Sequence, residues 1–277
     1  MAANLDSIVA ATRKRVAETR RQVNLRELER LAEQHRPRGF GQALRTAAAS
    51  RVAMIAELKK ASPSKGIIRA DLDVPKLVRE LVDAGACALS ILTDEEFFQG
   101  SLENLRAASA AAPVPCLRKD FIVDEFQLIE SRANGADAVL LIAAVLEQHE
   151  LRAFYAAAHA LELDVLAEVH NEREVERVLD AGCDIVGVNS RDLRTFQVDL
   201  NTPLRLAPLL PEHVLRIAES GIRSGRDIRH LRQAGYGAFL IGESLMTAAS
   251  AGAALLALLA GANENSSDEL AAARQED

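Results

Sequence analysis

The sequence is poor in several residue types that would mark a specialised class of protein. It has no Trp, three Met and three Cys, and aromatic residues make up 4% of its 277 residues. The cysteines Cys87, Cys116 and Cys183 are odd in number, widely spaced and not arranged as CxxC, so they indicate neither a disulfide framework nor a zinc site. We therefore expect a reducing, cytoplasmic compartment.

Long apolar runs and an excess of positive charge are also missing. The longest apolar run, residues 248–262, is too short to span a bilayer and predicts a packing helix. The first thirty residues are dense in Arg and Glu and contain no signal-peptide stretch. A net charge of −7 argues against a nucleic-acid surface. We expect no membrane and no nucleic-acid partner.

Apolar residues, at 49% of the chain, suffice for a large core, and their pattern changes along the sequence. Residues 1–50 have apolar residues at helical spacing and predict an amphipathic N-terminal extension that caps the rest. Residues 262–277 are polar and acidic and predict a weakly ordered tail. Between them, residues 51–261 alternate helical segments with short apolar runs, which predict strands near 52–57, 86–92, 114–118, 137–142, 164–169, 184–188, 214–218 and 238–241.

This alternation predicts an α/β fold with a parallel sheet, because each crossover between parallel strands needs a helix. Eight such units favour a closed (β/α)8 TIM barrel. A doubly wound open sheet is the competitor, but no GxGxxG follows the first strand and no change of composition marks a second domain. An internal repeat also favours closure: at spacings of about fifty residues, a helix ends in Gly before an apolar run, at 83–85, 133–135, 180–182 and 233–235.

Several of the apolar runs end in isolated polar groups. The clearest is VAMIAELKKASPSKG (52–66), where a buried run gives way to a carboxylate, two lysines and a loop. A solvated strand end explains each case alone, but charges that converge at one barrel mouth are more typical of function, because buried charges cost stability. The candidates are Glu57, Lys59, Arg118, Lys119, Asp120, Glu168, Asn189, Arg191, Glu219, Ser220, Gly242 and Glu243.

Glycines after the last two strands predict an anion site. Glu219-Ser220-Gly221 and Ile241-Gly242-Glu243-Ser244 place backbone N–H groups where barrels often bind phosphate. For one loop alone, a simple turn would be the better interpretation. Both loops together predict a phosphorylated small-molecule substrate.

Long stretches of the chain carry a family resemblance: IAELKKASPSKG, FFQGS, RKDFIVDEFQL, ADAVLLIAA, LAEVHNEREVERVLDAGCDIVGVNSRDLRTFQVDL and AESGIRSGRDI. They resemble the indole-3-glycerol phosphate synthases of tryptophan biosynthesis, from the N-terminal helices to about Met246. Ser190 replaces an expected asparagine, and Glu243 stands where some members have a small hydroxyl residue. The chain has room for one barrel, so the resemblance implies a monofunctional enzyme.

The resemblance implies that 1-(2-carboxyphenylamino)-1-deoxyribulose 5-phosphate is closed to indole-3-glycerol phosphate with loss of carbon dioxide and water. This chemistry needs proton donors and acceptors, and neither a cofactor nor a metal is expected. We expect a monomer or weak homodimer. The implied catalytic residues are Lys119 as general acid, Glu168 as its proton-transfer partner, and Glu57, Lys59, Asn189 and Glu219. The implied substrate-binding residues are Ser62, Phe98, Phe121, Leu140, Arg191, Leu193, Ser220, Gly221, Gly242 and Glu243.

Two other functions stay open at this point. A Schiff-base lyase acting on a ketose phosphate would use Lys119 or Lys59 as nucleophile. A phosphate-ligand sensor on a barrel scaffold is the non-catalytic alternative, since fold alone does not fix function. Residues 61–71 form a longer loop than most strand-to-helix connections and predict a mobile flap over the mouth.

Overall fold

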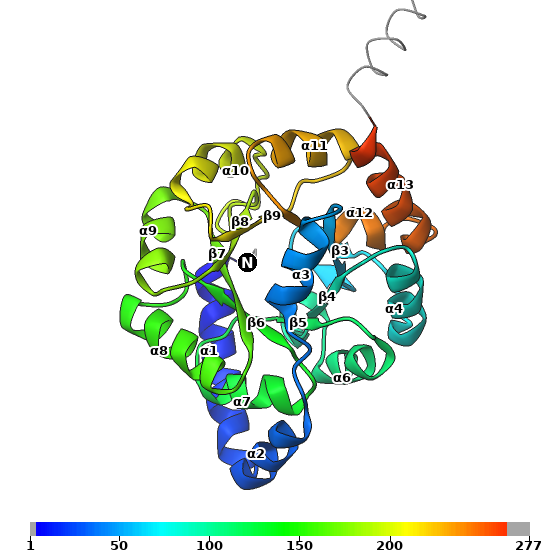
Figure 1. The fold of residues 1–277 in the computed structure, drawn as a ribbon. Helices are drawn as coiled ribbons and strands as arrows, with labels where there is room; N and C mark the ends of the chain where they lie inside the picture. The colour runs from blue at the N-terminus through cyan, green and yellow to red at the C-terminus, as the bar shows by residue number, and fades with distance from the viewer. Residues whose placement is uncertain (1–3, 265–277) are drawn as a thin grey trace, which may run out of the picture.

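The strands of the computed structural model, which describes residues 4–264, form a closed barrel. Eight parallel strands pair in chain order, and the last pairs with the first (Figure 1). The predicted (β/α)8 barrel is confirmed, and each predicted strand is shifted by at most two residues at either end. The strands are β1 (Ala53–Leu58), β4 (Ala88–Leu92), β5 (Cys116–Lys119), β6 (Ala138–Ile142), β7 (Asp164–Val169), β8 (Ile185–Asn189), β9 (Leu215–Glu219) and β10 (Ala238–Ile241).

Strand alternation divides the apolar residues into two layers. In β1, Met54 and Ala56 join the layer between barrel and helices, whereas Ala53 and Ile55 join the layer inside the barrel. Successive side chains of a strand point to opposite faces, so the other strands divide in the same way. Both layers are buried, which explains why the strands read as continuous apolar runs.

Amphipathic helices cover the outside of the barrel. In α9 (Glu172–Asp180), for example, the N-cap side chain of Asn171 accepts a hydrogen bond from the backbone N–H of Glu174, and Val175 and Val178 are buried. The other elements of this layer are α4 (Val74–Asp83), α6 (Leu102–Ala111), α7 (Phe126–Ala133), α8 (Gln148–Ala160), α10 (Asn201–Leu206), the 3₁₀ helix η1 (Ala207–Leu209), α11 (Gly225–Gln233), α12 (Glu243–Met246) and α13 (Ala251–Asn263). The short helix α5 (Glu95–Phe98) follows β4, and its Phe98 packs against the interior layer.

The repeated glycines end helices, as predicted. Gly85, Gly135, Gly182 and Gly235 have φ angles of 105°, 85°, 86° and 92°. This left-handed conformation is favourable for Gly, and it turns the chain from each helix into the next strand.

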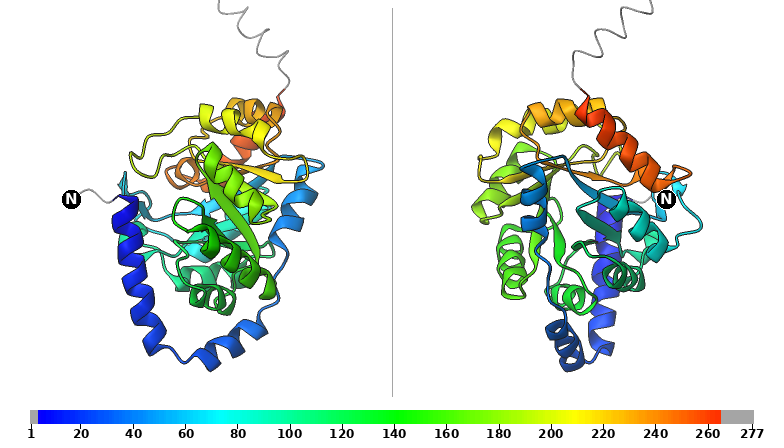
Figure 2. Two further views of the ribbon diagram at one scale, coloured as in Figure 1. Left: turned by 90° about the vertical axis from the view of Figure 1, so that its left-hand side faces the viewer. Right: turned by 45° about the vertical axis from the view of Figure 1, so that its right-hand side comes forward.

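The N-terminal helices border both ends of the barrel (Figure 2). They are α1 (Leu5–Gln22), α2 (Leu25–Gln34) and α3 (Phe40–Ala48). Helix α3 closes the amino-terminal end, where Phe40 and Leu44 are fully buried in the interior layer. Helix α1 lies at the opposite end, where Leu5 and Ile8 belong to the same apolar cluster as Phe121.

The segment after β1 and the end of the chain complete the fold. Residues 61–71 contain a short antiparallel hairpin of β2 (Ala61–Ser62) and β3 (Gly66–Ile67), and their predicted mobility stays a prediction.

Helix α13 buries Leu255 and Leu258, which confirms the predicted packing helix and carries the fold two residues past position 261. Residues 265–277 of the predicted tail lie outside the described residues. Within residues 4–264, no helix is both long and apolar enough to cross a membrane.

Candidate active site

Polar side chains from five strands meet at the carboxyl-terminal mouth of the barrel. Each lies two or four residues after an apolar side chain of the interior layer, and strand alternation therefore directs it into the barrel. The carboxyl ends of parallel strands lie at one end of a barrel. The five side chains line a single cavity of about 370 Å³, and they are Glu57, Lys119, Glu168, Asn189 and Glu219.

Lys119 lies between two buried carboxyl groups. Its Nζ is 2.9 Å from Oε2 of Glu168 and 3.7 Å from Oε2 of Glu219. Burial alone would lower the pKa of Lys119, but the charges of Glu168, Glu219 and Glu57 outweigh it and raise this pKa above its usual value. Lys119 therefore carries its proton at neutral pH.

The two carboxyl groups beside Lys119 differ in protonation. Burial favours the neutral form of both, but Lys119 and His170 hold the pKa of Glu168 below its ordinary value. For Glu219, burial and the nearby Glu168 and Glu57 outweigh Lys119 and raise the pKa to about 8. Glu168 is therefore ionised at neutral pH, while Glu219 is mostly protonated.

Gly187 provides the space for the Glu219 side chain. A Cβ atom at this position of β8 would collide with Oε1 of Glu219. The same Oε1 atom is buried and has no hydrogen-bond partner among residues 4–264. The Glu219 carboxyl group is thus buried with one oxygen that forms no hydrogen bond. This is typical of a group that acts on a ligand.

A second pair of opposite charge lies across the mouth. Lys59 Nζ is 2.6 Å from Oε1 of Glu57, and both residues line the cavity. Gly242 of the last strand-to-helix loop leaves room for this carboxylate, because a Cβ there would collide with Glu57 Oε1. The site therefore contains two separate ammonium–carboxylate pairs.

One end of the cavity collects groups that favour an anion. Ser220 and Gly221 have φ angles of 63° and 78°, a consecutive left-handed pair. This conformation is unusual for a serine and costs roughly 1 kcal/mol or more, and such strain is common at binding loops. Arg191 also lines this end, as does Ser244, whose Oγ is buried without a hydrogen-bond partner in the described part of the chain.

Part of the cavity wall is apolar. Phe98 and Phe121 have ring centroids 6.3 Å apart with planes tilted by 41°. Leu140 and Leu193 line the same cavity. A planar aromatic group can pack between such side chains while polar groups act on its edge.

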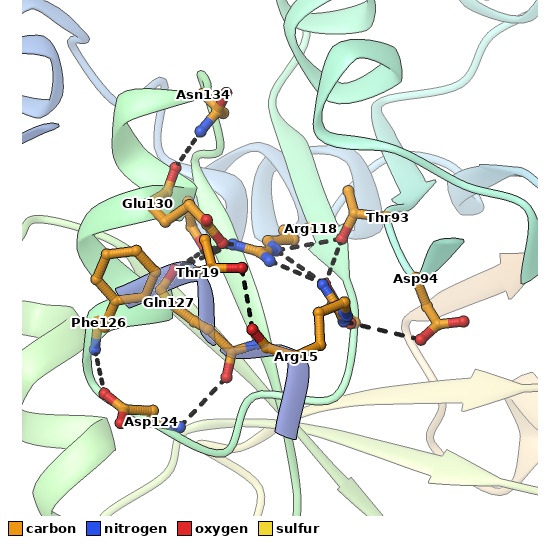
Figure 3. Close-up of polar contacts among 12 residues, drawn as sticks. Arg15, Thr19, Thr93, Asp94, Arg118, Asp124, Phe126, Gln127, Glu130 and Asn134 are labelled. Atoms are coloured by element: carbon orange, nitrogen blue, oxygen red, sulfur yellow. Dashed lines mark hydrogen bonds and ion pairs between the residues drawn. The ribbon is translucent and has the colours of Figure 1, made fainter. Parts of the chain in front are cut away.

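Arg118, which the sequence suggested for the mouth, lies outside the barrel. It is fully buried and contacts Oδ2 of Asp120 at 2.9 Å. It also contacts Oε2 of Glu130 at 2.8 Å, and Figure 3 shows these two residues side by side. The correction follows from strand alternation, since Lys119 is the neighbour that points inward. Figure 3 also shows Arg15 of α1 beside this network, 3.8 Å from Oδ2 of Asp94. The network fixes the end of β5 and so the position of Lys119.

Apart from Arg118, all but one of the predicted site residues line the cavity. Ser62 is the exception, because it lies in the β2–β3 hairpin with its Oγ 3.5 Å from that of Ser64. Sequence reasoning missed several residues: Pro63, Ser64, Asp94, Phe196 and Arg223 line the cavity, and His170 lies behind Glu168. Arg223 follows the glycine loop after β9, so proximity in sequence could have identified it.

Comparisons with known proteins agree with this site. The family model for indole-3-glycerol phosphate synthase matches residues 5–258. Among curated relatives, the indole-3-glycerol phosphate synthase of Koribacter versatilis is 52% identical over 259 residues, which cover 94% of this chain and all of the relative. That of Carboxydothermus hydrogenoformans is 44% identical and covers 92% of this chain and 99% of the relative.

Solved structures show a similar fold at much lower identity. Thiamine phosphate pyrophosphorylase from Pyrococcus furiosus has a TM-score of 0.55 and 16% identity, covering 75% of this chain and 93% of that one. Such a likeness supports the barrel fold alone. From the family model and the curated relatives, the chain belongs to the indole-3-glycerol phosphate synthase family, carboxy-lyases of tryptophan biosynthesis.

Proposed function

We propose that Lys119 is the general acid of this site and that Glu168 is its proton-transfer partner. The family reaction closes 1-(2-carboxyphenylamino)-1-deoxyribulose 5-phosphate to indole-3-glycerol phosphate and releases carbon dioxide and water. The observation that carries the assignment is the 2.9 Å contact between Lys119 Nζ and Glu168 Oε2 inside the cavity. General acid–base catalysis needs this closeness before any other property.

Ring closure needs an acid that keeps its proton until the carbonyl oxygen receives it. The aromatic carbon that bears the carboxylate forms a bond to the ribulose carbonyl carbon, and the carbonyl oxygen takes up the proton of Lys119. When carbon dioxide leaves, the bonding electron pair stays in the ring and restores its aromaticity. The raised pKa of Lys119, with burial outweighed chiefly by the Glu168 carboxylate, keeps the proton in place until that step.

Dehydration needs a second donor and an acceptor, because a hydroxyl leaves as water while a base removes a proton. The Lys59–Glu57 pair supplies another donor and acceptor in the same cavity. Glu219, with a pKa raised by burial to about 8, is a third group that holds a proton at neutral pH. Asn189 completes the polar site and accepts a hydrogen bond from the Arg191 backbone N–H through Oδ1.

The cavity has one end for each half of the substrate. We propose that Arg191 and the backbone N–H groups of Ser220, Gly221, Gly242 and Glu243 hold the phosphate. The Glu243 carboxylate is already paired with Arg191 at 3.3 Å and Lys65 at 3.5 Å, so its backbone is the useful group. The aromatic half of the substrate packs on Phe98, Phe121, Leu140 and Leu193.

We also propose a cytoplasmic enzyme that acts as a monomer or weak homodimer. One chain supplies every group named above. The three cysteines are buried and free, and burial raises the pKa of Cys116 and of Cys183 to about 12, so these two remain thiols. Free thiols are the usual state in a reducing compartment. Sedimentation equilibrium at micromolar concentration checks the oligomeric state.

Single-turnover kinetics test the acid. The indole product is fluorescent, and a chain without Trp gives little background. Replacement of Lys119 by Met should lower the rate about a hundredfold to ten-thousandfold. Substrate affinity should fall much less, because the residues proposed to bind the phosphate are unchanged. Lys59→Met is the matched comparison. A near-normal rate in Lys119→Met would identify Lys59 as the acid.

A Schiff-base lyase is disfavoured by the same electrostatics. Its lysine must lose a proton to become a nucleophile, but the carboxylates around Lys119 stabilise the ammonium form and raise its pKa despite burial. Borohydride added with substrate should leave no adduct. A covalent adduct on Lys119 or Lys59 would overturn the acid–base assignment.

A further inference from the structure

His170 directly follows β7 and lies between two carboxylates. Its Nε2 is 3.4 Å from Oε1 of Glu168, and its Nδ1 is 3.1 Å from Oε2 of Glu174. The backbone N–H of His170 donates to the same oxygen of Glu174 at 2.8 Å. The imidazole is mostly buried, with 13% of its side chain exposed.

Glu174 is itself held in place at the start of α9. Nδ2 of Asn171 donates to Oε1 of Glu174 at 2.6 Å, and Oδ1 of Asn171 accepts from the Glu174 backbone N–H at 3.0 Å. With both oxygens of Glu174 engaged, the imidazole is anchored at Nδ1. Its Nε2 atom then faces Glu168 and has no hydrogen-bond partner in the described part of the chain.

The geometry favours an imidazolium over either neutral form. A neutral imidazole has one nitrogen without a proton, and that lone pair would face a carboxylate oxygen of Glu168 or Glu174. Burial alone would lower the pKa of His170, but these two carboxylates raise it to about 10. Asp192, in the loop after β8, adds a third negative charge nearby.

The four side chains form a row of alternating charge from α9 to the centre of the cavity. The order is Glu174, His170, Glu168 and Lys119. The two oxygens of Glu168 are thereby divided, since Oε1 faces His170 and Oε2 faces Lys119. When Lys119 gives up its proton, His170 is the cation that remains beside Glu168.

We propose that His170 is a positioning residue for Glu168, an inference that rests on the proton-transfer role proposed for that carboxylate. The imidazolium orients the Glu168 carboxylate with Oε2 toward Lys119. It also keeps Glu168 ionised during the step in which Lys119 has given up its proton. Reactive side chains are held in a productive geometry by the buried groups packed behind them.

Two substitutions separate positioning from a purely structural role. In His170→Asn, the side-chain amide reaches the position of Nδ1 and keeps the contact with Glu174, but no donor faces Oε1 of Glu168. In His170→Gln, the amide reaches the position of Nε2 and can still donate to Glu168. His213→Asn is the matched control, because His213 is exposed and precedes β9 at the opposite end of the barrel.

We expect kcat to fall about tenfold to a hundredfold in His170→Asn with little change in KM, and to fall less in His170→Gln. Loss of a neighbouring cation raises the pKa of Glu168, so the acid limb of the kcat–pH profile should move to higher pH in both variants. Histidine ¹⁵N NMR of the wild type at pH 8 should show a doubly protonated ring whose signal is missing in both His170 variants.

A wild-type kcat and pH profile in a folded His170→Asn would overturn the inference, as would a neutral His170 ring at pH 8. A neutral ring overturns the inference even if the Asn variant does not fold. Glu168→Gln separates the two proposals. If it is inactive while His170→Asn is normal, only the positioning role fails, and if it is active, the role of Glu168 fails too.

Discussion

Buried carboxyl groups lie at both ends of the barrel, and their surroundings differ. At the amino-terminal end, Asp137 accepts hydrogen bonds from His35, from the backbone and guanidinium of Arg38, and from the backbone N–H of Cys116. Burial would raise the pKa of Asp137, but these partners lower it. At the mouth, Glu219 has an oxygen without a partner and a pKa that burial raises to about 8.

The difference indicates separate roles for the buried carboxyl groups at the two ends of the barrel. A carboxylate with a full set of donors is committed to holding α3 and its approach segment against the strands. A carboxyl group with an oxygen that forms no hydrogen bond can still bind a substrate or exchange a proton, but the unpaired buried oxygen lowers the stability of the fold. We therefore expect substitutions at the mouth to affect activity and substitutions at the opposite end to affect stability.

Glu168→Gln should give the largest effect on activity. The amide keeps the shape of the side chain but cannot accept the proton, which should lower kcat about a hundredfold to ten-thousandfold. Substrate binding, measured by titration under non-turnover conditions, should change much less. A variant that lost stability but kept its kcat would remove the contrast between the two ends.

Asp137→Asn should give the largest effect on stability. Loss of the charge leaves Arg38 without its buried partner, and we expect unfolding free energy to fall by about 3 kcal/mol in urea titrations. The kcat of the folded enzyme should not change. Asp180→Asn breaks the exposed pair with Arg152 and is the matched control, expected to cost at most about 0.5 kcal/mol.

Gly187→Ala tests whether catalysis depends on the space that Gly187 leaves for the Glu219 side chain. The added Cβ would collide with Oε1 of Glu219 and displace its carboxyl group from the mouth. A shift of about 1 Å typically costs up to a hundredfold in rate, so we expect kcat to fall about tenfold to a hundredfold. Gly237→Ala is the control, because a Cβ there meets its nearest neighbour, Cβ of Ala48, at 3.4 Å. Equal kcat values in the two variants would contradict the proposed role of Glu219.

The last prediction concerns how Glu219 links stability to pH. Its pKa is raised from 4.5 to about 8 on folding, chiefly by burial, so the folded state binds its proton more tightly than the unfolded state does. The stabilisation is complete below about pH 4.5 and is lost as the pH rises through about 8. Relative to Glu219→Gln, the wild type should therefore lose unfolding free energy between pH 5 and pH 8. A constant difference across this range would show that Glu219 is ionised throughout.

Much of the fold was readable from sequence, because barrel strands buried on both faces must be continuously apolar. The runs at 164–169 and 238–241 match β7 and β10 residue for residue. The pairing of Lys119 with Glu168 was also predictable, since both lie on inward positions at the ends of nearby strands. Residue type and alternation suffice for such predictions.

Only the tertiary structure decided the details that control chemistry. The sequence places Glu168 and Glu219 in equivalent positions, yet Lys119 Nζ is 2.9 Å from one and 3.7 Å from the other, and their pKa values move in opposite directions. The contact of His170 with Glu168 and the turn of Arg118 away from the mouth were likewise decided by tertiary packing. Electrostatic energies change over fractions of an ångström in a buried site, and a linear sequence specifies which groups can meet but not at what distance.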